Sequence, residues 1–197
     1  RQAAACHCIG VPTSIVASYP TEPGFIEAIA GLIRPALAGI AAGGKTPRLL
    51  LTAHGLPKKI VRGGDPYPAQ AEATASAIVA ALAWPDLDWQ LCYQSRVGPL
   101  AWLEPATEAE IRRAGAEKMP LVVAPIAFVS EHSETLVELD LDYRKLAEES
   151  GVPSYRRVAT VGTEPRFIAA LAALVMRART EGSIGMPAGG AQRRLSR

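Results

Sequence analysis

The sequence predicts an α/β fold, a doubly wound, four-stranded parallel sheet flanked by helices. Two observations support this fold class. Short β-rich runs alternate along the chain with longer amphipathic runs, and this strand–helix alternation repeats four times. Two of the strand candidates, residues 48–53 and 121–128, are continuous apolar runs, which is typical of strands buried on both faces of a parallel sheet. Right-handed crossovers between such strands place helices on both faces of the sheet.

The predicted elements follow in chain order. A strand over 13–19 leads through Pro23 into a helix over 22–41. The buried strand over 48–53 precedes an alanine-rich helix over 69–83. The rest of the chain is predicted to alternate in the same way, with strands over 89–95, 121–128 and 155–159 and helices over 107–118, 130–150 and 164–179.

Length and composition exclude several classes of protein. The 197 residues suit one domain, and a hydrophobic fraction of 49% with balanced charge excludes a disordered or collagen-like chain. No stretch reaches the roughly 18 apolar residues of a membrane span, because Arg34 and Pro35 interrupt the best candidate at 26–40. We therefore expect a cytoplasmic protein.

The positive charge is concentrated at the C-terminus. The formal net charge is +2, yet the Gly-, Ala- and Arg-rich residues 177–197 alone contribute +4. The remainder is therefore slightly acidic, and we expect no nucleic-acid partner. We expect residues 180–197 to form a disordered basic tail. Such a tail is compatible with peripheral contact to an anionic membrane, and an exposed sheet edge is compatible with an oligomer.

Polar and aromatic side chains follow three of the predicted strands. His54 follows the first buried strand, Tyr93 and Trp102 lie at and after the end of the next, and the segment 131–134 (Glu-His-Ser-Glu) follows the third. Ligands of doubly wound sheets bind at the carboxyl ends of the strands, which meet at one edge. The sequence therefore predicts that these side chains converge on a single site.

A row of carboxylates continues from this segment. Glu134, Glu138 and Asp142 are four residues apart, so on a regular helix over 130–150 they share one face. A solvated helix face explains this spacing most simply. The alternative is a relay of carboxylates that passes a divalent cation or protons toward His54.

His54 and Glu134 together offer one nitrogen and one oxygen ligand, a set that suits Fe²⁺, Co²⁺ or Zn²⁺ better than Mg²⁺. Two ligands are too few for a closed structural site, so we expect a metal to bind only transiently. Glu131 and His132 are candidates to orient Glu134. A lone histidine at such a position can also serve only to hydrogen-bond a loop.

Three blocks of this sequence resemble the ferrochelatases, enzymes that insert Fe²⁺ into a porphyrin. The blocks are residues 49–57 with 64–67, 93–99 with 102–103, and 125–128 with 131–140, and the resemblance spans about 11–177. It identifies residues 11–179 as the C-terminal α/β lobe of that family. Residues 1–10 do not resemble the segment that should precede this lobe, so we expect an atypical N-terminal segment there.

The resemblance also implies roles for individual residues. It implies a catalytic pair that binds the metal, formed by His54 and Glu134. It implies a proton or metal relay formed by Glu131, His132, Glu138 and Asp142. It further implies that Tyr93 and Trp102 face the porphyrin.

The activity implied by the resemblance is that of a lyase in haem biosynthesis. It inserts Fe²⁺ into protoporphyrin IX or coproporphyrin III and releases two protons. Porphyrin and ferrous iron are then substrates, and no cofactor is permanently bound. Some relatives carry an iron–sulfur cluster on cysteines near the C-terminus, but no cysteine follows Cys92, so none is expected here.

Two alternatives to this activity remain open. The family has two similar lobes with the porphyrin between them, and this sequence resembles only the second. We therefore expect a truncated chain whose own activity is doubtful, so a catalytically silent metal- or porphyrin-binding fragment is one alternative. A related chelatase that takes cobalt or nickel is the other, and the blocks around Tyr93 and Pro125 favour a ferrochelatase over it.

Overall fold

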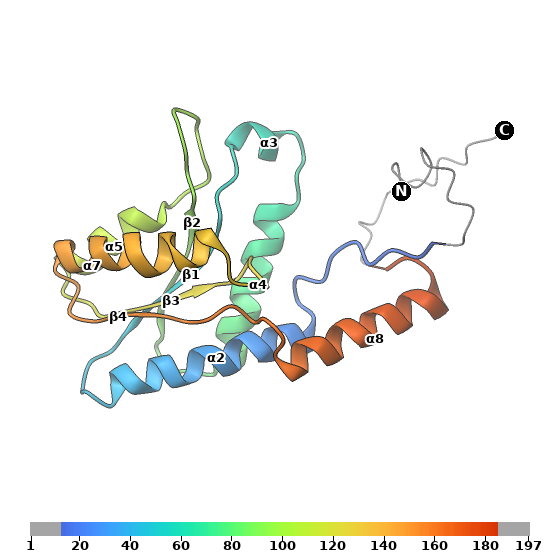
Figure 1. The fold of residues 1–197 in the computed structure, drawn as a ribbon, viewed down its shortest axis with the longest axis horizontal. Coiled ribbons are helices and arrows are strands. Elements are labelled where there is room, and N and C mark those ends of the chain that lie inside the picture. The colour runs from blue at the N-terminus through green and yellow to red at the C-terminus, as the bar shows by residue number, and fades with distance from the viewer. Residues whose placement is uncertain (1–12, 185–197) are drawn as a thin grey trace.

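The computed structural model describes residues 13–184, and Figure 1 shows how its elements are arranged. Its sheet has four parallel strands in the order β2-β1-β3-β4. Their bounds are Arg48–His54 (β1), Asp88–Gln94 (β2), Leu121–Pro125 (β3) and Tyr155–Arg157 (β4). The predicted α/β class and parallel sheet are confirmed. The predicted N-terminal segment 1–10 and most of the basic tail 180–197 lie outside the described residues.

Helices cover both faces of the sheet. Alternate residues of β1 point to opposite faces: Leu49 and Leu51 pack in one core cluster, and Leu50 packs in the other. The first cluster lies under α2 (Pro23–Ala41) and α4 (Tyr67–Leu82), and the second under α5 (Thr107–Ala116) and α7 (Tyr143–Ser150). A short α3 (Lys58–Arg62) follows β1, and α8 (Pro165–Glu181) packs against α2 and extends from the body (Figure 1).

The predicted strand over 13–19 is wrong. In the structure this segment forms a single bridge, between Val16 and Ile184, and joins no strand of the sheet. The main chain of Ala17 and Ile15 bonds to that of Ile184, at 3.0 and 2.9 Å. The segment therefore satisfies its backbone beside the end of α8. β-branched residues favour extended backbone, but an extended segment becomes a sheet strand only where the fold brings it beside the sheet, and this segment lies beside Ile184.

The prediction of one continuous helix over 130–150 is also wrong. It is divided into α6 (Ser133–Leu136), a π-helical turn η1 (Glu138–Asp142) and α7. Within η1 the N–H of Asp142 donates to the carbonyl of Val137 at 3.0 Å, one residue further back than in an α-helix. The wider turn leaves Leu139 fully buried while Leu141 is exposed.

Helix α2 is long and apolar enough, by length and composition alone, to cross a membrane. The predicted helix over 22–41 is confirmed, and Arg34 and Pro35 do not disqualify it by composition as the sequence analysis expected. The Arg34 guanidinium donates to the carbonyl of Ala81 at 2.7 Å. The apolar side chains of Ile29, Ile33 and Leu37 are buried in the domain core. The core helix of an α/β domain needs the same composition.

The close packing of α5 on α7 depends on Gly115. A Cβ atom there would overlap the carbonyl of Ser150 and lie 2.7 Å from the Ser150 Cβ. We expect Gly115→Ala to lower the free energy of unfolding by about 1–3 kcal/mol, because two helices must move apart. Gly31→Ala, inside α2, is the matched control, because its Cβ would meet only the flexible end of Arg166, at 3.4 Å.

The two substitutions should change stability in opposite directions. Gly31→Ala should raise the free energy of unfolding by about 0.5–1 kcal/mol, since alanine favours a helix interior. Urea unfolding of the three proteins measures both effects. Equal stability of Gly115→Ala and the parent would contradict the packing described here.

Candidate active site

His54 is the last residue of β1, and its side chain is 39% exposed. Its Nδ1 lies 2.7 Å from the carbonyl oxygen of Gly55. A carbonyl oxygen only accepts, so Nδ1 carries the hydrogen, and a neutral His54 has its lone pair on Nε2. The Tyr67 hydroxyl donates to the main-chain carbonyl of His54 at 3.0 Å. Burial raises the pKa of Tyr67 to about 12, which keeps this hydroxyl a donor.

Gly55 allows the ends of β1 and β2 to approach closely. Its N–H donates to the carbonyl of Gln94 at 2.7 Å. A Cβ on Gly55 would lie 2.8 Å from that same oxygen and 3.4 Å from Cε3 of Trp102. The absence of a side chain therefore places His54, the end of β2 and the indole of Trp102 around one point.

Glu134 reaches the site from the start of α6. His132 caps this helix, and its Nδ1 accepts a hydrogen bond from the N–H of Glu134 at 3.2 Å. A neutral His132 therefore carries its hydrogen on Nε2, the opposite tautomer to His54. Glu134 Oε1 lies 3.5 Å from His54 Nε2, and both side chains are 39% exposed.

The contact between His54 and Glu134 has a chemical consequence. In neutral His54 the Nε2 atom is an acceptor, and it faces a carboxylate oxygen, which is also an acceptor. Neither atom donates to the other unless a cation stands between them. A proton or a divalent metal ion would satisfy both atoms, which is what this arrangement can do chemically.

Phe128 is a site residue to which the sequence analysis gave no role. Its ring centroid lies 4.8 Å from that of His132 and 6.4 Å from that of His54. The ring therefore supports both imidazoles from the loop that follows β3. The sequence offered one signal for this role: Phe128 lies in a block that resembles a known family.

Glu138 is held by four hydrogen bonds. Oε1 accepts from the N–H of Ser95 at 2.7 Å and from the Tyr143 hydroxyl at 2.8 Å. Oε2 accepts from the Ser95 hydroxyl at 2.5 Å and from the amide of Gln94 at 3.1 Å. The carboxylate thus ties η1 to the end of β2.

Asp142 does not continue a regular row with Glu134 and Glu138. The π-helical turn lies between Glu138 and α7, so the predicted spacing no longer defines one helix face. Asp142 is exposed, and in the described part of the chain its side chain forms no hydrogen bond or ion pair. The relay role of Glu138 and Asp142 stays a prediction.

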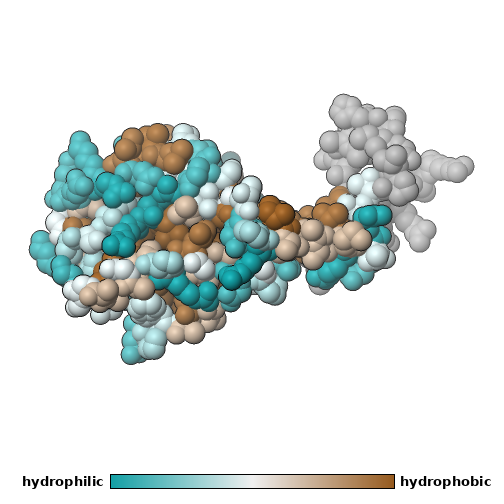
Figure 2. Space-filling view, turned by 60° about the horizontal axis from the view of Figure 1, so that its bottom comes forward, coloured by the Kyte–Doolittle hydropathy of each residue, from teal (hydrophilic) through white to brown (hydrophobic). Residues whose placement is uncertain are grey.

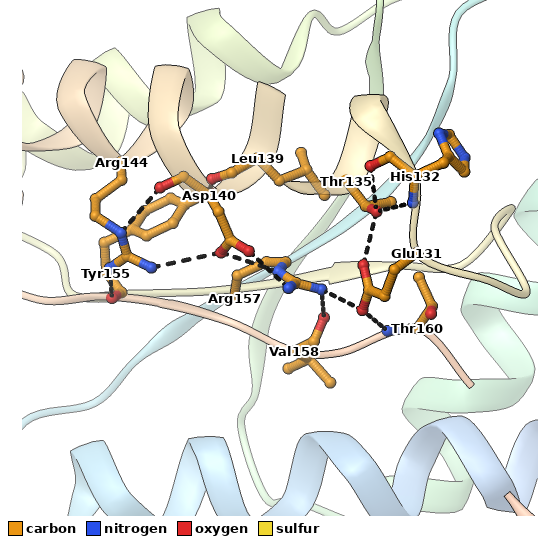
Figure 3. A network of polar contacts seen from close by, with 10 residues as sticks. All are labelled: Glu131, His132, Thr135, Leu139, Asp140, Arg144, Tyr155, Arg157, Val158 and Thr160. Carbon is orange, nitrogen blue, oxygen red and sulfur yellow. Dashed lines mark hydrogen bonds and ion pairs between the residues drawn. The ribbon is translucent and has the colours of Figure 1, made fainter. Parts of the chain in front are cut away.

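Glu131 belongs to a polar network that joins the start of α6 to β4 (Figure 3). Its carboxylate accepts from the Thr135 hydroxyl at 2.6 Å, from Arg157 at 2.7 Å and from the N–H of Thr160 at 2.9 Å. Arg157 also binds Asp140 through two bonds, at 3.0 and 2.6 Å. Figure 3 shows the Glu131 carboxylate turned toward Arg157 while the His132 imidazole points away from the network.

This network favours the ionised form of the Glu131 carboxyl group. Burial alone would raise the pKa of its carboxyl, but the hydrogen bonds from Thr135, Thr160 and Arg157 outweigh burial and lower it. Glu131 is therefore an anchored anion that joins the start of α6 to β4. A role as a mobile relay would require these bonds to break.

The two aromatic residues expected to face a porphyrin have different surroundings. Tyr93 is 5% exposed and packs in the core cluster under α2 and α4. Trp102 is half-buried beside Gly55, and its indole N–H has no hydrogen-bond partner in the described chain. The structure thus brings Trp102 to the His54 site and leaves Tyr93 in the core.

No group of three or more His, Cys, Asp or Glu side chains that could hold a metal is found within residues 13–184. Cys92 is fully buried, and burial raises the pKa of its thiol to about 12, so it remains protonated. A cation held by His54 and Glu134 would keep open coordination positions. Such a site suits an ion in transit better than a resident ion.

The fold and the site define a class of protein. They show an α/β domain with a histidine and a carboxylate facing each other at the carboxyl ends of parallel strands. Comparison with known proteins adds the family: the ferrochelatase family model matches residues 1–179. The chain belongs to the ferrochelatase family.

Individual relatives agree with this assignment. The chain is 55% identical over 167 residues to a ferrochelatase of Caulobacter vibrioides, covering 84% of this chain and 47% of the relative. It is 56% identical over 158 residues to one of Phenylobacterium zucineum (80% and 45%) and 44% identical over 169 residues to one of Rickettsia bellii (86% and 46%). The chain thus spans about half the length of the curated relatives it matches.

The Glu131 network predicts a pH dependence of stability. Since the pKa of Glu131 is lowered in the folded state, its anion stabilises the fold above the unfolded pKa of about 4.3, and this contribution is lost as the pH falls through the folded pKa. Glu131→Gln removes the contribution. The gap in free energy of unfolding between parent and variant should be widest near neutral pH and should narrow on acidification.

Urea unfolding from about pH 7 to about pH 3 measures this gap. Glu149→Gln is the control, because Glu149 is 62% exposed and pairs with Lys145 only at 3.8 Å. Its profile should follow that of the parent. A Glu131→Gln gap that stays constant with pH would show that the carboxylate is not held as described.

Proposed function

We propose that this chain carries the metal-inserting site of a ferrochelatase, which places Fe²⁺ in a porphyrin and releases two protons. One observation carries the proposal: His54 Nε2 and Glu134 Oε1 face each other at 3.5 Å with no donor between them. Family membership supports the same reaction. Protoporphyrin IX and coproporphyrin III both remain candidate substrates.

The chemistry follows from these two atoms. A porphyrin carries two pyrrole N–H protons in the plane of its ring, and both must leave as the metal enters. The lone pair on Nε2 of His54 accepts a proton, and the adjacent Glu134 carboxylate stabilises the imidazolium that forms. The same two atoms suit transient binding of Fe²⁺. Bending the macrocycle, which exposes its nitrogens, is strain that binding elsewhere must offset.

Exposed apolar side chains that lie close in the sequence to Trp102 and Glu134 support a macrocyclic substrate. Val97 and Leu100, in the loop after β2, are 75% and 58% exposed, and Leu136 on α6 is 47% exposed. These residues flank the segments that carry Trp102 and Glu134. A flat apolar ring bound there would cover surface that is otherwise in water.

A second candidate is a domain that binds metal or porphyrin without turnover. The observation in its favour is that His54 and Glu134 are each 39% exposed, so one side of the site is open. A porphyrin must be held on both faces to be bent. The chain spans about half the length of its relatives, so the described residues supply one wall of such a site.

We further propose that iron is a substrate and that neither an iron–sulfur cluster nor another cofactor is resident. Cys92, the one cysteine within residues 13–184, supports this because its thiol is buried and protonated and so is a poor ligand. We also propose a cytoplasmic location.

Anaerobic insertion of Fe²⁺ or Zn²⁺ into porphyrin by this chain tests the function. We expect the parent to form metalloporphyrin, and His54→Ala and Glu134→Ala to lower the rate by about 10²–10⁴-fold, because each removes one member of the pair. Glu149→Ala, on the exposed end of α7, is the control and should keep the parent's rate.

The two candidates give different results. Porphyrin binding without product, measured by fluorescence, would select the silent domain. Turnover that survives in both His54→Ala and Glu134→Ala would contradict the proposed site altogether.

A further inference from the structure

Gln94, the last residue of β2, contacts both halves of the proposed site. We propose that Gln94 is a positioning residue, which sets the separation of His54 and Glu134 through hydrogen bonds from its main chain and its side chain. The inference rests on the proposed function, since it names the residue that holds the side chains of His54 and Glu134 at their separation.

The main chain of Gln94 fixes the strand end that carries His54. Gln94 and His54 are direct partners in the pairing of β2 with β1. One residue on, the N–H of Gly55 donates to the Gln94 carbonyl at 2.7 Å. The backbone of His54 and that of Gly55 are therefore both held against β2.

The side chain of Gln94 fixes Glu134. Its Nε2 donates to the main-chain carbonyl of Glu134 at 2.8 Å and to Oε2 of Glu138 at 3.1 Å. The reverse orientation of the amide would place its oxygen against two acceptors, so the partners dictate the orientation. Both amide hydrogens are used to hold the segment from α6 to η1.

The burial of Gln94 indicates what its side chain is for. The residue is fully buried, and in the described chain its Oε1 is also buried without a hydrogen-bond partner. Burying an unpaired carbonyl is unfavourable, and an apolar side chain of this size would avoid it. We therefore attribute the presence of glutamine at this position to the two hydrogen bonds that its Nε2 donates.

Glu134 depends on this bond because α6 is short. The helix has four residues, so little regular helix holds Glu134 in place. The cap from His132 fixes its N–H, and Gln94 fixes its carbonyl. Without the Gln94 bond, the Glu134 carboxylate is free to move relative to His54, and displacements of about 1 Å at reacting groups can lower rates strongly.

Three variants test the proposal. Gln94→Met keeps the length of the side chain and removes both donors. Gln94→Glu keeps the shape and can donate only when its carboxyl is protonated. Gln90→Met is the matched control, because Gln90 is in the same strand and, among residues 13–184, its amide bonds only to the nearby carbonyl of Leu91, at 2.9 Å.

The first measurement needs no turnover. The ¹⁵N chemical shift of His54 Nε2 reports the Glu134 charge beside it, and Glu134→Ala gives its value without that charge and without a new hydrogen-bond donor. We expect Gln94→Met to move the shift toward the Glu134→Ala value and Gln90→Met to leave it unchanged. A folded Gln94→Met with the parent's shift would overturn the proposal.

The second measurement is metal insertion. We expect Gln94→Met to lower kcat by about 10–100-fold and to leave the KM for porphyrin close to that of the parent, since no porphyrin contact is lost. An unchanged kcat would overturn the proposal. If the parent itself shows no turnover, the proposed function fails, and the chemical shift still decides the role of Gln94.

The pH profile of Gln94→Glu separates positioning from packing. The introduced carboxyl would face Glu138, and two adjacent carboxyls retain one proton to higher pH than either would alone. The protonated form can donate as the amide does, so the rate of Gln94→Glu relative to the parent should rise as the pH falls. A ratio that does not change with pH would contradict the role assigned to the donated hydrogen bond.

Discussion

The pairing of β1 with β2 up to their last residues is the constraint on which the site depends. Because the strands are parallel and in register through His54 and Gln94, both chains leave the sheet at the same edge. Gly55 lets them leave in close contact. On the face that Figure 2 presents, apolar patches lie among polar ones. The apolar core thus fixes His54, and the loops need only bring partners to it.

The second half of the site is a short helical segment held at several points. The Glu131 network ties its start to β4, Glu138 ties its middle to the end of β2, and Leu139 anchors it in the core. Carboxylates that lie close together in the sequence therefore have different tasks. Glu131 and Glu138 are occupied by hydrogen bonds within the protein, and Glu134 is left facing His54.

The sequence predicted the fold and the central pair, but not how the pair is held. The buried run at 48–53 required a covered parallel strand, and His54 at its end had to lie at the ligand-binding edge. The family resemblance added the role of Glu134. The π-helical turn was not predictable from spacing, because the spacing argument assumed α-helical bonds, whereas Asp142 donates to Val137, five residues back. The capture of Glu131 by Arg157, 26 residues away, is a tertiary contact that no local pattern encodes.

The central claim is that His54 and Glu134 receive one cation between them. X-ray absorption at the zinc edge of this chain loaded with Zn²⁺ tests it most directly. The account predicts one imidazole nitrogen and carboxylate oxygen within about 2.0–2.2 Å of the metal, with the imidazole signal lost in His54→Ala. An identical spectrum from the parent and His54→Ala would contradict the account, because the metal would then be bound elsewhere.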